Sequence, residues 1–432
     1  MNFNDLKIPV IQNADLKDKV VLVRVDHNVV KKGQIKDAYR IDSTIGTIAY
    51  ILAKGGKPIL MTHGGRPKDK ATGNINISDD SSVAPIVDYL RKKLNLAIMT
   101  PEFTESDSNG YMAIDTSVNL MIKELRADEI DMIYMPNTRW FYGEERKDAA
   151  ADILALQFAG LADVFVNDAF GSYRPHVSVV GPTHYLPSYA GFLMQKEIEN
   201  LDRIYNPERP FVAVVAGSKF DTKIETLNML LEVADKLVLG GVMYNTYLTS
   251  KYGIKIKGVS EEDTASARKF AENCTKCKEK LVELPYIIES DTLDGKFEGQ
   301  YRERAISDLR EGDELNYVLD VSKRSFDDDT VKEVFSSANL FFVNAVMGFT
   351  PNFQEGTIAL DNIIHENKAA SKLFGGGDTL QEMKLLVPSI YMHGLDDPTY
   401  YMFTGGGAVL KAIQEGKATE MDMIQALITQ KL

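Results

Sequence analysis

Three glycine clusters in the second half of the chain have a recognisable chemical use. They are Gly240-Gly241, Gly375-Gly376-Gly377-Asp378-Thr379 and Thr404-Gly405-Gly406-Gly407. The second and third are each followed by a helical pattern. Glycine before a helix lets backbone N–H groups approach an anion, with the positive end of the helix dipole behind them. Each cluster alone also fits a tight turn, but two of them opening helices in one half predict phosphate binding there.

Cationic side chains in the first half follow a different pattern. Five arginines lie at the end of an expected strand or in the loop after it: Arg24, Arg40, Arg66, Arg139 and Arg174, with His63 and His176 beside two of them. Ligands of open α/β sheets bind beyond the carboxyl ends of the strands, and the arginine fork fits carboxylate and phosphate. A single arginine is usually a surface ion-pair residue, but the repeated placement predicts a shared anion pocket. Arg24 is the weakest member because it lies within its strand.

The elements that must position these residues alternate between strand and helix. Apolar runs predict strands at residues 19–26, 57–62, 133–136, 163–167, 210–216, 236–239, 316–320, 340–344 and 390–392. Helix-length segments include residues 42–54, 81–94, 149–161, 222–234 and 265–281. Strands that are apolar throughout are typical of a parallel sheet buried on both faces. The pattern predicts an α/β fold of doubly wound parallel sheets.

The number of strands exceeds what one ordinary sheet holds, so we expect two domains. The N-terminal domain is expected at residues 1–187 and the C-terminal domain at residues 207–414. A hinge helix at residues 188–206 would join them, with Asn206-Pro207 ending it. An active-site cleft is expected between the two domains.

Composition and charge exclude several function classes. Of the 432 residues, 44% are hydrophobic and 26% charged, as in a soluble globular protein, and no stretch is apolar enough to span a bilayer. The net charge of −13 argues against nucleic-acid binding. The start has no signal-peptide pattern, and the single cysteine pair fits a reducing compartment. We expect a cytoplasmic monomer that binds neither nucleic acid nor membrane.

Motifs of other ligand-binding families are absent. The P-loop pattern G-x-x-x-x-G-K-[ST] does not occur, and Leu380 and Leu410 occupy the last place of a G-x-G-x-x-G fingerprint. A P-loop NTPase or a dinucleotide dehydrogenase is therefore disfavoured. Cys274-x-x-Cys277 lacks the two further ligands of a zinc site, so we interpret it as a chance spacing on a helix.

An ordered set of motifs from about residue 19 to residue 410 resembles the phosphoglycerate kinase family. In the first half they are Arg24-Val25-Asp26-His27-Asn28-Val29, Tyr39-Arg40-Ile41, His63-Gly64-Gly65-Arg66-Pro67, Asn137-Thr138-Arg139, Val166-Asn167-Asp168-Ala169-Phe170-Gly171 and Tyr173-Arg174-Pro175-His176. Residues 186–194 are similar to the segment that leads into the family's interdomain helix. In the second half the matches are Gly217-Ser218-Lys219-Phe220-Asp221-Thr222-Lys223-Ile224, residues 375–379 and residues 404–408.

The resemblance implies a reaction and a set of site residues. The reaction is reversible, Mg²⁺-dependent phosphoryl transfer between 1,3-bisphosphoglycerate with ADP and 3-phosphoglycerate with ATP, which is a step of glycolysis. The resemblance implies direct in-line transfer with closure of the hinge.

The site residues are implied by the same motifs. Residues implied to hold 3-phosphoglycerate are Asp26, Asn28, Arg40, His63, Arg66, Arg139 and Arg174. Residues implied to bind the nucleotide are Lys219, Lys223, Gly240, Gly241, Asn344, Gly376, Gly377, Asp378 and Thr379. Asp378 would bind the Mg²⁺ of the nucleotide. The groups implied to act on the migrating phosphoryl group are Arg40, Lys219, Gly376 and Gly377. Residues 415–432 would return to the N-terminal domain.

Departures from the family pattern cluster in the nucleotide half. The family's NGPMGVFE reads Asn344-Ala345-Val346-Met347-Gly348-Phe349-Thr350-Pro351 here. The acidic residue expected at the ribose is missing, and we do not expect Glu355 to replace it. Gly240-Gly241-Val242 and residues 319–323 each lack an adenine-side glycine, and residues 394–399 are interpreted as an added loop. These changes predict weak nucleotide affinity and leave the base preference open.

Two other functions fit the same residues. One is a divergent paralogue that uses another acyl phosphate or another nucleotide, and the other is a non-catalytic binding protein on the same fold. Retention of Arg40, Lys219, Lys223 and Asp378 favours an enzyme, because a degenerate paralogue has no physical need for all four.

Overall fold

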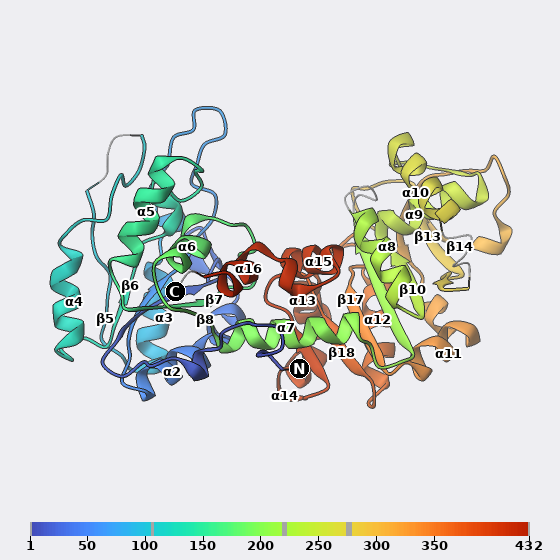
Figure 1. Ribbon diagram of the computed structural model, residues 1–432. Coiled ribbons are helices and arrows are strands. Elements are labelled where there is room, and N and C mark those ends of the chain that lie inside the picture. Colours follow the sequence, from blue (N-terminus) through green and yellow to red (C-terminus); the bar gives the residue numbers. More distant parts are fainter. Residues whose placement is uncertain (1, 105–107, 218–222, 274–278, 431–432) are drawn as a thin grey trace. The chain divides into compact units, whose positions relative to one another are not determined.

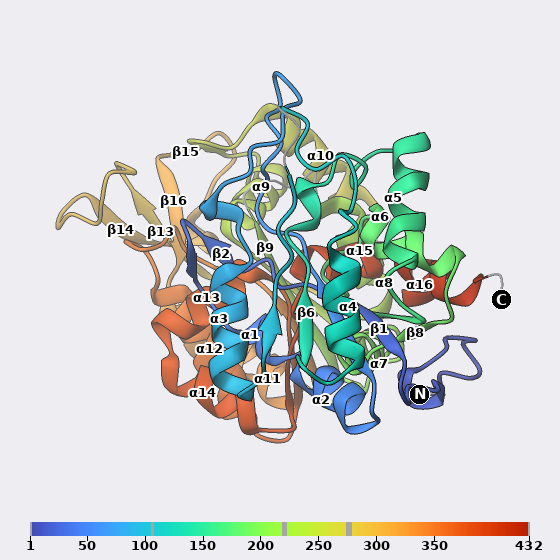
Figure 2. The ribbon, with the colours of Figure 1, turned by 90° about the vertical axis from the view of Figure 1, so that its left-hand side faces the viewer.

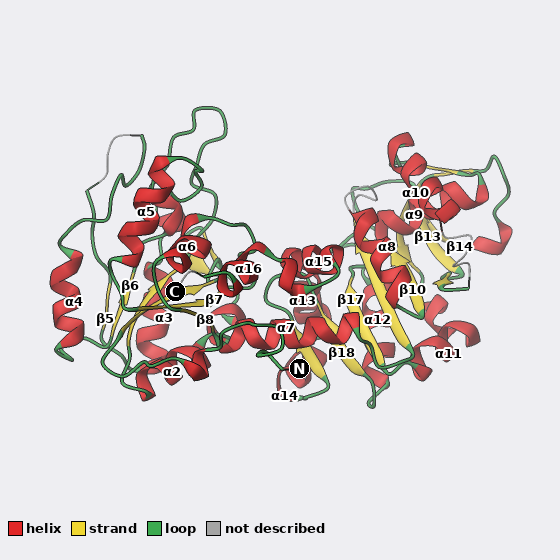
Figure 3. Ribbon diagram, viewed as in Figure 1, coloured by secondary structure: helices red, strands yellow, loops and turns green. Residues whose placement is uncertain are grey.

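The chain divides into two compact units, seen in the computed structural model (Figure 1). The structure describes residues 2–104, 108–217, 223–273 and 279–430. The N-terminal unit comprises Met1–Glu199 and Ala418–Leu432, and the C-terminal unit comprises Asn200–Lys417. Each unit has a parallel sheet flanked by helices (Figure 3). The predicted two-domain, doubly wound α/β architecture is confirmed.

Six parallel strands form the sheet of the N-terminal unit, in the order β5-β6-β4-β1-β7-β8. They are β1 (Val20–Val25), β4 (Lys57–Met61), β5 (Ile98–Met99), β6 (Met132–Tyr134), β7 (Val164–Asp168) and β8 (Ser188–Ala190). The helices are α1 (Tyr39–Asp42), α2 (Ile45–Ala53), α3 (Ala84–Leu94), α4 (Val118–Arg126), α5 (Ala149–Ala159), α6 (Val177–Val180) and α16 (Asp422–Ile428). A two-stranded hairpin, β2 (Val30–Lys31) and β3 (Gln34–Ile35), follows β1.

Strand β1 shows why this sheet has a hydrophobic core on each face. All six of its residues are buried, and successive side chains point to opposite faces. Val20 and Leu22 pack in the core cluster that includes Leu125 of α4. Val21 and Val23 pack in the other cluster, which includes Leu90 of α3. Accordingly, α3 and α4 lie on either side of β6 in Figure 2.

The C-terminal unit has a second six-stranded parallel sheet, in the order β12-β10-β9-β17-β18-β19. The strands are β9 (Phe211–Gly217), β10 (Lys236–Gly240), β12 (Leu281–Val282), β17 (Leu340–Asn344), β18 (Ser371–Phe374) and β19 (Tyr400–Met402). The helices are α8 (Ile224–Val233), α9 (Gly241–Tyr252), α10 (Glu261–Asn273), α11 (Asp329–Ser337), α12 (Glu355–Glu366), α13 (Gly377–Leu386), α14 (Pro388–Asp396) and α15 (Gly406–Glu415).

Two small sheets complete this unit. The first is antiparallel, with β13 (Tyr286–Ser290) between β14 (Tyr301–Ala305) and β16 (Tyr317–Val321). The second pairs β11 (Lys255–Ile256) with β15 (Glu314–Leu315). Short 3₁₀ helices lie at Ile11–Asn13, Asp79–Ser81, Thr138–Trp140, Gly181–His184, Ile306–Asp308, Lys323–Asp327 and Ala418–Glu420. In the described ranges no helix combines the length and apolar character needed to cross a membrane.

Helix α7 (Phe192–Tyr205) runs from the end of one unit into the start of the other. Residues 188–190, which we predicted as the start of this helix, form strand β8 instead and pair with β7. The prediction failed there because Gly191 separates the strand from the helix by a single residue.

Two further predicted strands differ from the structure. Residues 390–392 lie in α14, where Ile390 and Tyr391 are buried but Met392 is 59% exposed. A helix has one buried side, so this short apolar run is part of a helical pattern. Residues 316–320 contribute to β16, but this strand belongs to the antiparallel sheet. The expected added loop at 394–399 begins inside α14.

Candidate active site

A cavity of about 360 Å³ lies beyond the carboxyl ends of the strands in the N-terminal unit. It is lined by Asn28, His63, Gly65, Arg66, Arg139, Gly171, Ser172, Tyr173, Arg174 and His176. These residues follow β1, β4, β6 and β7 in the chain, so the sheet brings four separate loops together. We call this cavity the arginine pocket. Five of the seven residues predicted for the acyl substrate line it: Asn28, His63, Arg66, Arg139 and Arg174.

Hydrogen bonds between loops fix the walls of the arginine pocket. The Asn28 side-chain oxygen accepts from the Gly65 N–H at 2.9 Å, and the Arg139 guanidinium donates to the Gly65 carbonyl. The Asn137 side-chain oxygen accepts from the N–H groups of Gly64 at 2.9 Å and Arg139 at 3.0 Å. The Arg139 side chain is thus held in place by the loop after β4.

The arginine pocket carries a surplus of positive charge. Within the described part of the chain, neither the Arg66 nor the Arg174 side chain makes a hydrogen bond or ion pair, and both residues are exposed. Arg139 forms an ion pair with Glu145, with 2.9 Å between Nε and Oε1. Two guanidinium groups therefore remain available to an anion, a geometry suited to phosphate or carboxylate.

His63 enters this pocket as a neutral side chain. Burial lowers its pKa well below the usual value, with Arg24 and Arg139 adding to the shift against the charge of Asp26. The Arg24 guanidinium lies 3.0 Å from Nδ1 of His63. Because arginine can only donate, Nδ1 accepts this bond and Nε2 carries the hydrogen. Arg24 itself is fully buried and donates to the Ser178 hydroxyl at 2.8 Å, so it supports the pocket from behind.

Asp26 and Arg40, the remaining two predicted residues, do not line the arginine pocket. They form an ion pair with 3.2 Å between Oδ2 and Nη1, in which Asp26 is 3% exposed and Arg40 28% exposed. Burial raises the pKa of the Asp26 carboxyl, but the charges of Arg40 and Arg24 bring it below its usual value. Asp26 is therefore a carboxylate that orients the guanidinium of Arg40.

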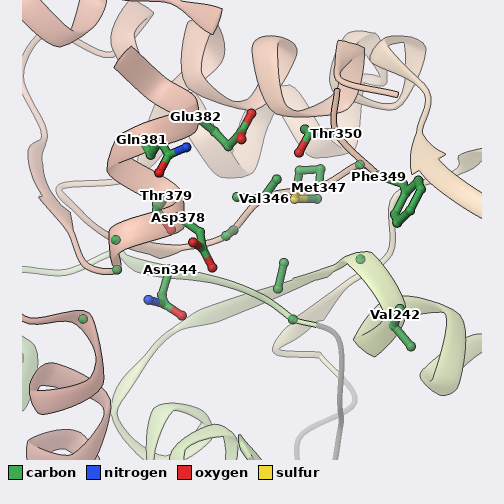
Figure 4. A pocket seen from close by; sticks show the side chains of 18 of the residues that line it. Val242, Asn344, Val346, Met347, Phe349, Thr350, Asp378, Thr379, Gln381 and Glu382 are labelled. Atoms are coloured by element: carbon green, nitrogen blue, oxygen red, sulfur yellow. The ribbon is translucent and has the colours of Figure 1, made fainter. Parts of the chain in front are cut away.

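A second cavity, of about 730 Å³, lies in the C-terminal unit (Figure 4). It lies beyond the carboxyl ends of β9, β10, β17 and β18, next to the N-terminal turns of α9, α13 and α15. We call it the glycine pocket. Seven of the predicted nucleotide residues line it: Lys223, Gly241, Asn344, Gly376, Gly377, Asp378 and Thr379. Lys219 lies outside the described residues, as do Cys274 and Cys277.

The two GGG runs meet backbone to backbone at one end of the glycine pocket. Gly376 has a φ of +119°, and a Cβ atom built there would lie 2.6 Å from Asn344 Nδ2. A Cβ atom at Gly406 would lie 2.1 Å from the Cα atom of Gly376. Only glycine fits at these two positions. A Cβ atom at Gly377 would meet nothing within 4 Å, so the first turn of α13 opens toward the cavity.

Lys223 provides the cation at this end of the glycine pocket. Its ammonium group donates to the carbonyl of Ala216 at 2.6 Å and to the side-chain oxygen of Asn344 at 2.9 Å. Asn344 in turn donates to the Gly375 carbonyl. Burial lowers the pKa of the Lys223 ammonium to about 8, against the opposing effect of the Asp378 charge. Lysine and helix amides together can hold phosphate groups.

Apolar groups form the other end of the glycine pocket. Val242, Val318, Leu319, Met347 and Phe349 line it, and Phe349 is 49% exposed. Gly240, predicted as a nucleotide contact, does not line the cavity. A Cβ atom there would lie 2.5 Å from the Met347 sulfur, so Gly240 lets Met347 pack closely behind the wall.

The acidic side chains of this cavity come from α13. Glu355 is not among the lining residues and pairs with Lys296. Gln381 and Glu382 also line the cavity, although no motif in the sequence marks them. The signal that would have found Glu382 is its spacing of four residues from Asp378, which places both carboxylates on one side of the helix.

The chain matches a family model described as phosphoglycerate kinase over residues 11–417. It belongs to the phosphoglycerate kinase family. A phosphoglycerate kinase of Thermosipho africanus is 34% identical over 418 residues, which cover 94% of this chain and 95% of that protein. The enzyme of Pseudothermotoga lettingae is 32% identical over 417 residues, 94% of this chain and 96% of the relative.

Solved structures agree with the family. The structure of phosphoglycerate kinase from Coxiella burnetii superposes with a TM-score of 0.75 at 27% identity, covering 97% of this chain and 98% of that one. The phosphoglycerate kinase of Pyrococcus horikoshii, 21% identical, has the same fold with a TM-score of 0.75 over 98% of this chain and 100% of its own. The predicted phosphoglycerate kinase activity, a glycolytic phosphotransfer to a carboxyl group, is confirmed by the family. A divergent substrate or a non-catalytic role is not favoured.

Proposed function

We propose that this phosphoglycerate kinase transfers the phosphoryl group between a nucleotide in the glycine pocket and the carboxylate of 3-phosphoglycerate in the N-terminal unit. The observation that carries the proposal is the presence in one chain of a cationic cavity and a glycine-amide cavity, each beyond the carboxyl ends of a parallel sheet. Each cavity suits one of the two anionic substrates of the reaction.

The arginine pocket is proposed to hold 3-phosphoglycerate by its phosphate group. Support comes from the two guanidinium groups, of Arg66 and Arg174, that lack partners within the described chain. His63 would add a neutral N–H donor and Asn28 would fix the loop that presents Arg66. Charge-assisted bonds of this kind are the strongest available to a dianion.

The phosphates of ATP or ADP are proposed to bind Lys223 and the amides of Gly376 and Gly377. The Asp378 carboxylate would bind the Mg²⁺ of the nucleotide. It lines the cavity in the first turn of α13, and its carboxylate makes no hydrogen bond or ion pair with the described residues. One carboxylate fits a cation that takes its other ligands from phosphates and water. When bound, Mg²⁺ supplies charge neutralisation to the phosphate oxygens.

In the transfer itself, a carboxylate oxygen of 3-phosphoglycerate forms a bond to the γ-phosphorus as the bond to the leaving ADP oxygen breaks. No side-chain nucleophile and no proton transfer are needed. Charge on the three equatorial oxygens is proposed to be stabilised by Arg40 and the amides of Gly376 and Gly377, with Lys219 assigned by resemblance alone. The ion pair with Asp26 orients the Arg40 guanidinium, and this supports the proposed role of Arg40 in the transfer.

Closure of the two units about the hinge helix is proposed to assemble these groups. Closure would also exclude water, which hydrolyses acyl phosphates. We further propose a monomer, because both cavities belong to a single chain, and a cytoplasmic location, because the reaction is a step of glycolysis.

A coupled assay with 3-phosphoglycerate and a panel of Mg²⁺-nucleotides tests the proposal. We expect turnover only when both substrates and Mg²⁺ are present, with a high KM for the nucleotide. Asp378→Ala is expected to lower kcat/KM by about 100-fold or more. The matched control is Asp396→Ala, an exposed acid at the end of α14, which should behave as wild type. Wild-type kcat/KM in Asp378→Ala would contradict the metal role.

A further inference from the structure

The glycine pocket contains a second carboxylate that no step of the reaction above uses. Glu382 lies four residues after Asp378 on α13, and both line the cavity. Residues four apart lie on the same side of a helix. In Figure 4 the side chain of Glu382 faces Thr350 across the upper part of the cavity. Nowhere in the described ranges does its carboxylate find a hydrogen bond or an ion pair, although the side chain is partly buried.

The two ends of the cavity define where a nucleotide would extend. Lys223 and the Gly376–Gly377 amides mark the phosphate end, and Val242 and Phe349 mark the apolar end. An α-helix rises about 1.5 Å per residue, so Glu382 lies roughly 6 Å further along α13 than Asp378. This displacement carries its carboxylate away from the phosphate-binding turn, toward Thr350 (Figure 4).

The loop on the opposite wall offers no alternative acid. It runs from Asn344 to Pro351 and contains no Asp or Glu. The next acidic residue, Glu355, begins α12, is engaged with Lys296 and does not line the cavity. Among the described residues that line this cavity, Glu382 is therefore the one carboxylate that lies beyond the phosphate-binding turn.

We propose that Glu382 accepts hydrogen bonds from the ribose hydroxyls of the nucleotide, and so determines specificity for ribonucleotides. The inference rests on the proposed function. A carboxylate has two acceptor oxygens, which suit the two O–H donors of a vicinal diol, and bonds to a charged acceptor are stronger than neutral ones. A second metal ion is the weaker reading, because no group of three metal-ligating side chains exists in the described chain.

The test compares ATP with 2′-deoxyATP and 3′-deoxyATP in the coupled assay. Wild type is expected to prefer ATP by about 10-fold in kcat/KM over each analogue, as for one lost charge-assisted hydrogen bond. In Glu382→Ala the KM for ATP should rise by a similar factor, with kcat little changed, and the preference should fall to about one. Glu382→Gln, which keeps one acceptor oxygen, should retain part of the preference.

Glu355→Ala is the matched control, because it removes an acid near the cavity that does not line it. It should keep the wild-type preference. The proposal is overturned if Glu382→Ala still discriminates as wild type does, if wild type does not discriminate at all, or if Glu382→Ala raises the Mg²⁺ requirement equally for ATP and both analogues. If no turnover occurs with 3-phosphoglycerate, the proposed function fails, and equilibrium titration of the same nucleotides into the full-length protein still decides the role of Glu382.

Discussion

The protonation state of Lys223 is expected to make nucleotide binding in the glycine pocket depend on pH. Burial lowers the pKa of this ammonium to about 8, so in the free enzyme its charge is present below that pH and lost above it. We expect kcat/KM for the nucleotide, which reports the free enzyme, to fall as pH rises through about 8. Lys223→Arg keeps its charge throughout this range and should be less active but show no such fall. A wild-type profile that is flat to pH 9.5 would contradict this assignment.

Arg40 is expected to act on the transition state. In Arg40→Ala we predict a fall in kcat of about 10³-fold or more, as for other arginines on a transferring phosphoryl group. The buried Asp26 carboxylate would lose its ion pair, at a cost of roughly 1–3 kcal/mol in the free energy of unfolding.

The double variant Asp26→Asn/Arg40→Ala separates these two effects. It removes the unpaired charge, so stability measured by urea unfolding should partly recover, whereas kcat should stay low. Recovery of activity in the double variant would mean that Arg40 has only a structural role.

The sequence predicts the location of individual site residues well where their motif follows a strand. Arg66, Arg139 and Arg174 meet in one pocket because the carboxyl ends of neighbouring parallel strands share an edge. Ser172 and Tyr173 also line that pocket, but their contribution depends on the path of one loop, which residue type does not reveal. Lys219 lies outside the described residues, so its predicted role stays a prediction.

At the scale of elements, the contact between α13 and α15 decides whether the glycine pocket forms. Gly376 combines a positive φ with a Cβ position 2.6 Å from Asn344 Nδ2, whereas Gly377 has open space. We expect Gly376→Ala to lower the free energy of unfolding by roughly 1–3 kcal/mol, and Gly377→Ala to change it by less than about 0.5 kcal/mol. Urea unfolding followed by circular dichroism measures both. Equal effects of the two substitutions would contradict the packing described for this turn.

Whether a segment forms a strand or a helix was predictable where its buried residues follow the pattern expected for that element. The all-buried run of β1 lies in the predicted parallel sheet. The secondary structure of a three-residue apolar run was not predictable, since residues 390–392, expected as a strand, are one turn of α14. Strand β16 was found, but its antiparallel partner β13 and the strand β14, which pairs with the other edge of β13, were not. Strand pairing depends on contacts between distant segments, which the apolar pattern of one segment does not specify.

At the scale of the whole molecule, the end of the chain belongs to the N-terminal unit. Met423, Ile424 and Leu427 of α16 are buried there. The Gln430 side chain exchanges two hydrogen bonds of 2.9 Å with the backbone of Ser188.

Deleting residues 418–432 should therefore destabilise the N-terminal unit by roughly 5 kcal/mol or more, from the loss of the three buried apolar side chains of α16 together with buried Ala418 and Met421. The single tryptophan, Trp140, lies in that unit, so its fluorescence reports the unit's unfolding in urea. Gln430→Ala, which removes these two hydrogen bonds and one to the Leu427 carbonyl, should have a smaller effect. An unchanged tryptophan transition in the deletion variant would contradict the packing of α16.

In the proposed reaction one phosphoryl group passes directly between the nucleotide and the substrate carboxylate. Phosphorus NMR of the purified protein with MgATP and 3-phosphoglycerate follows that group itself. We predict that an acyl-phosphate resonance and ADP appear together, and only when both substrates are present. Release of inorganic phosphate in place of the acyl phosphate, or a phosphorylated protein formed from ATP alone, would contradict the account.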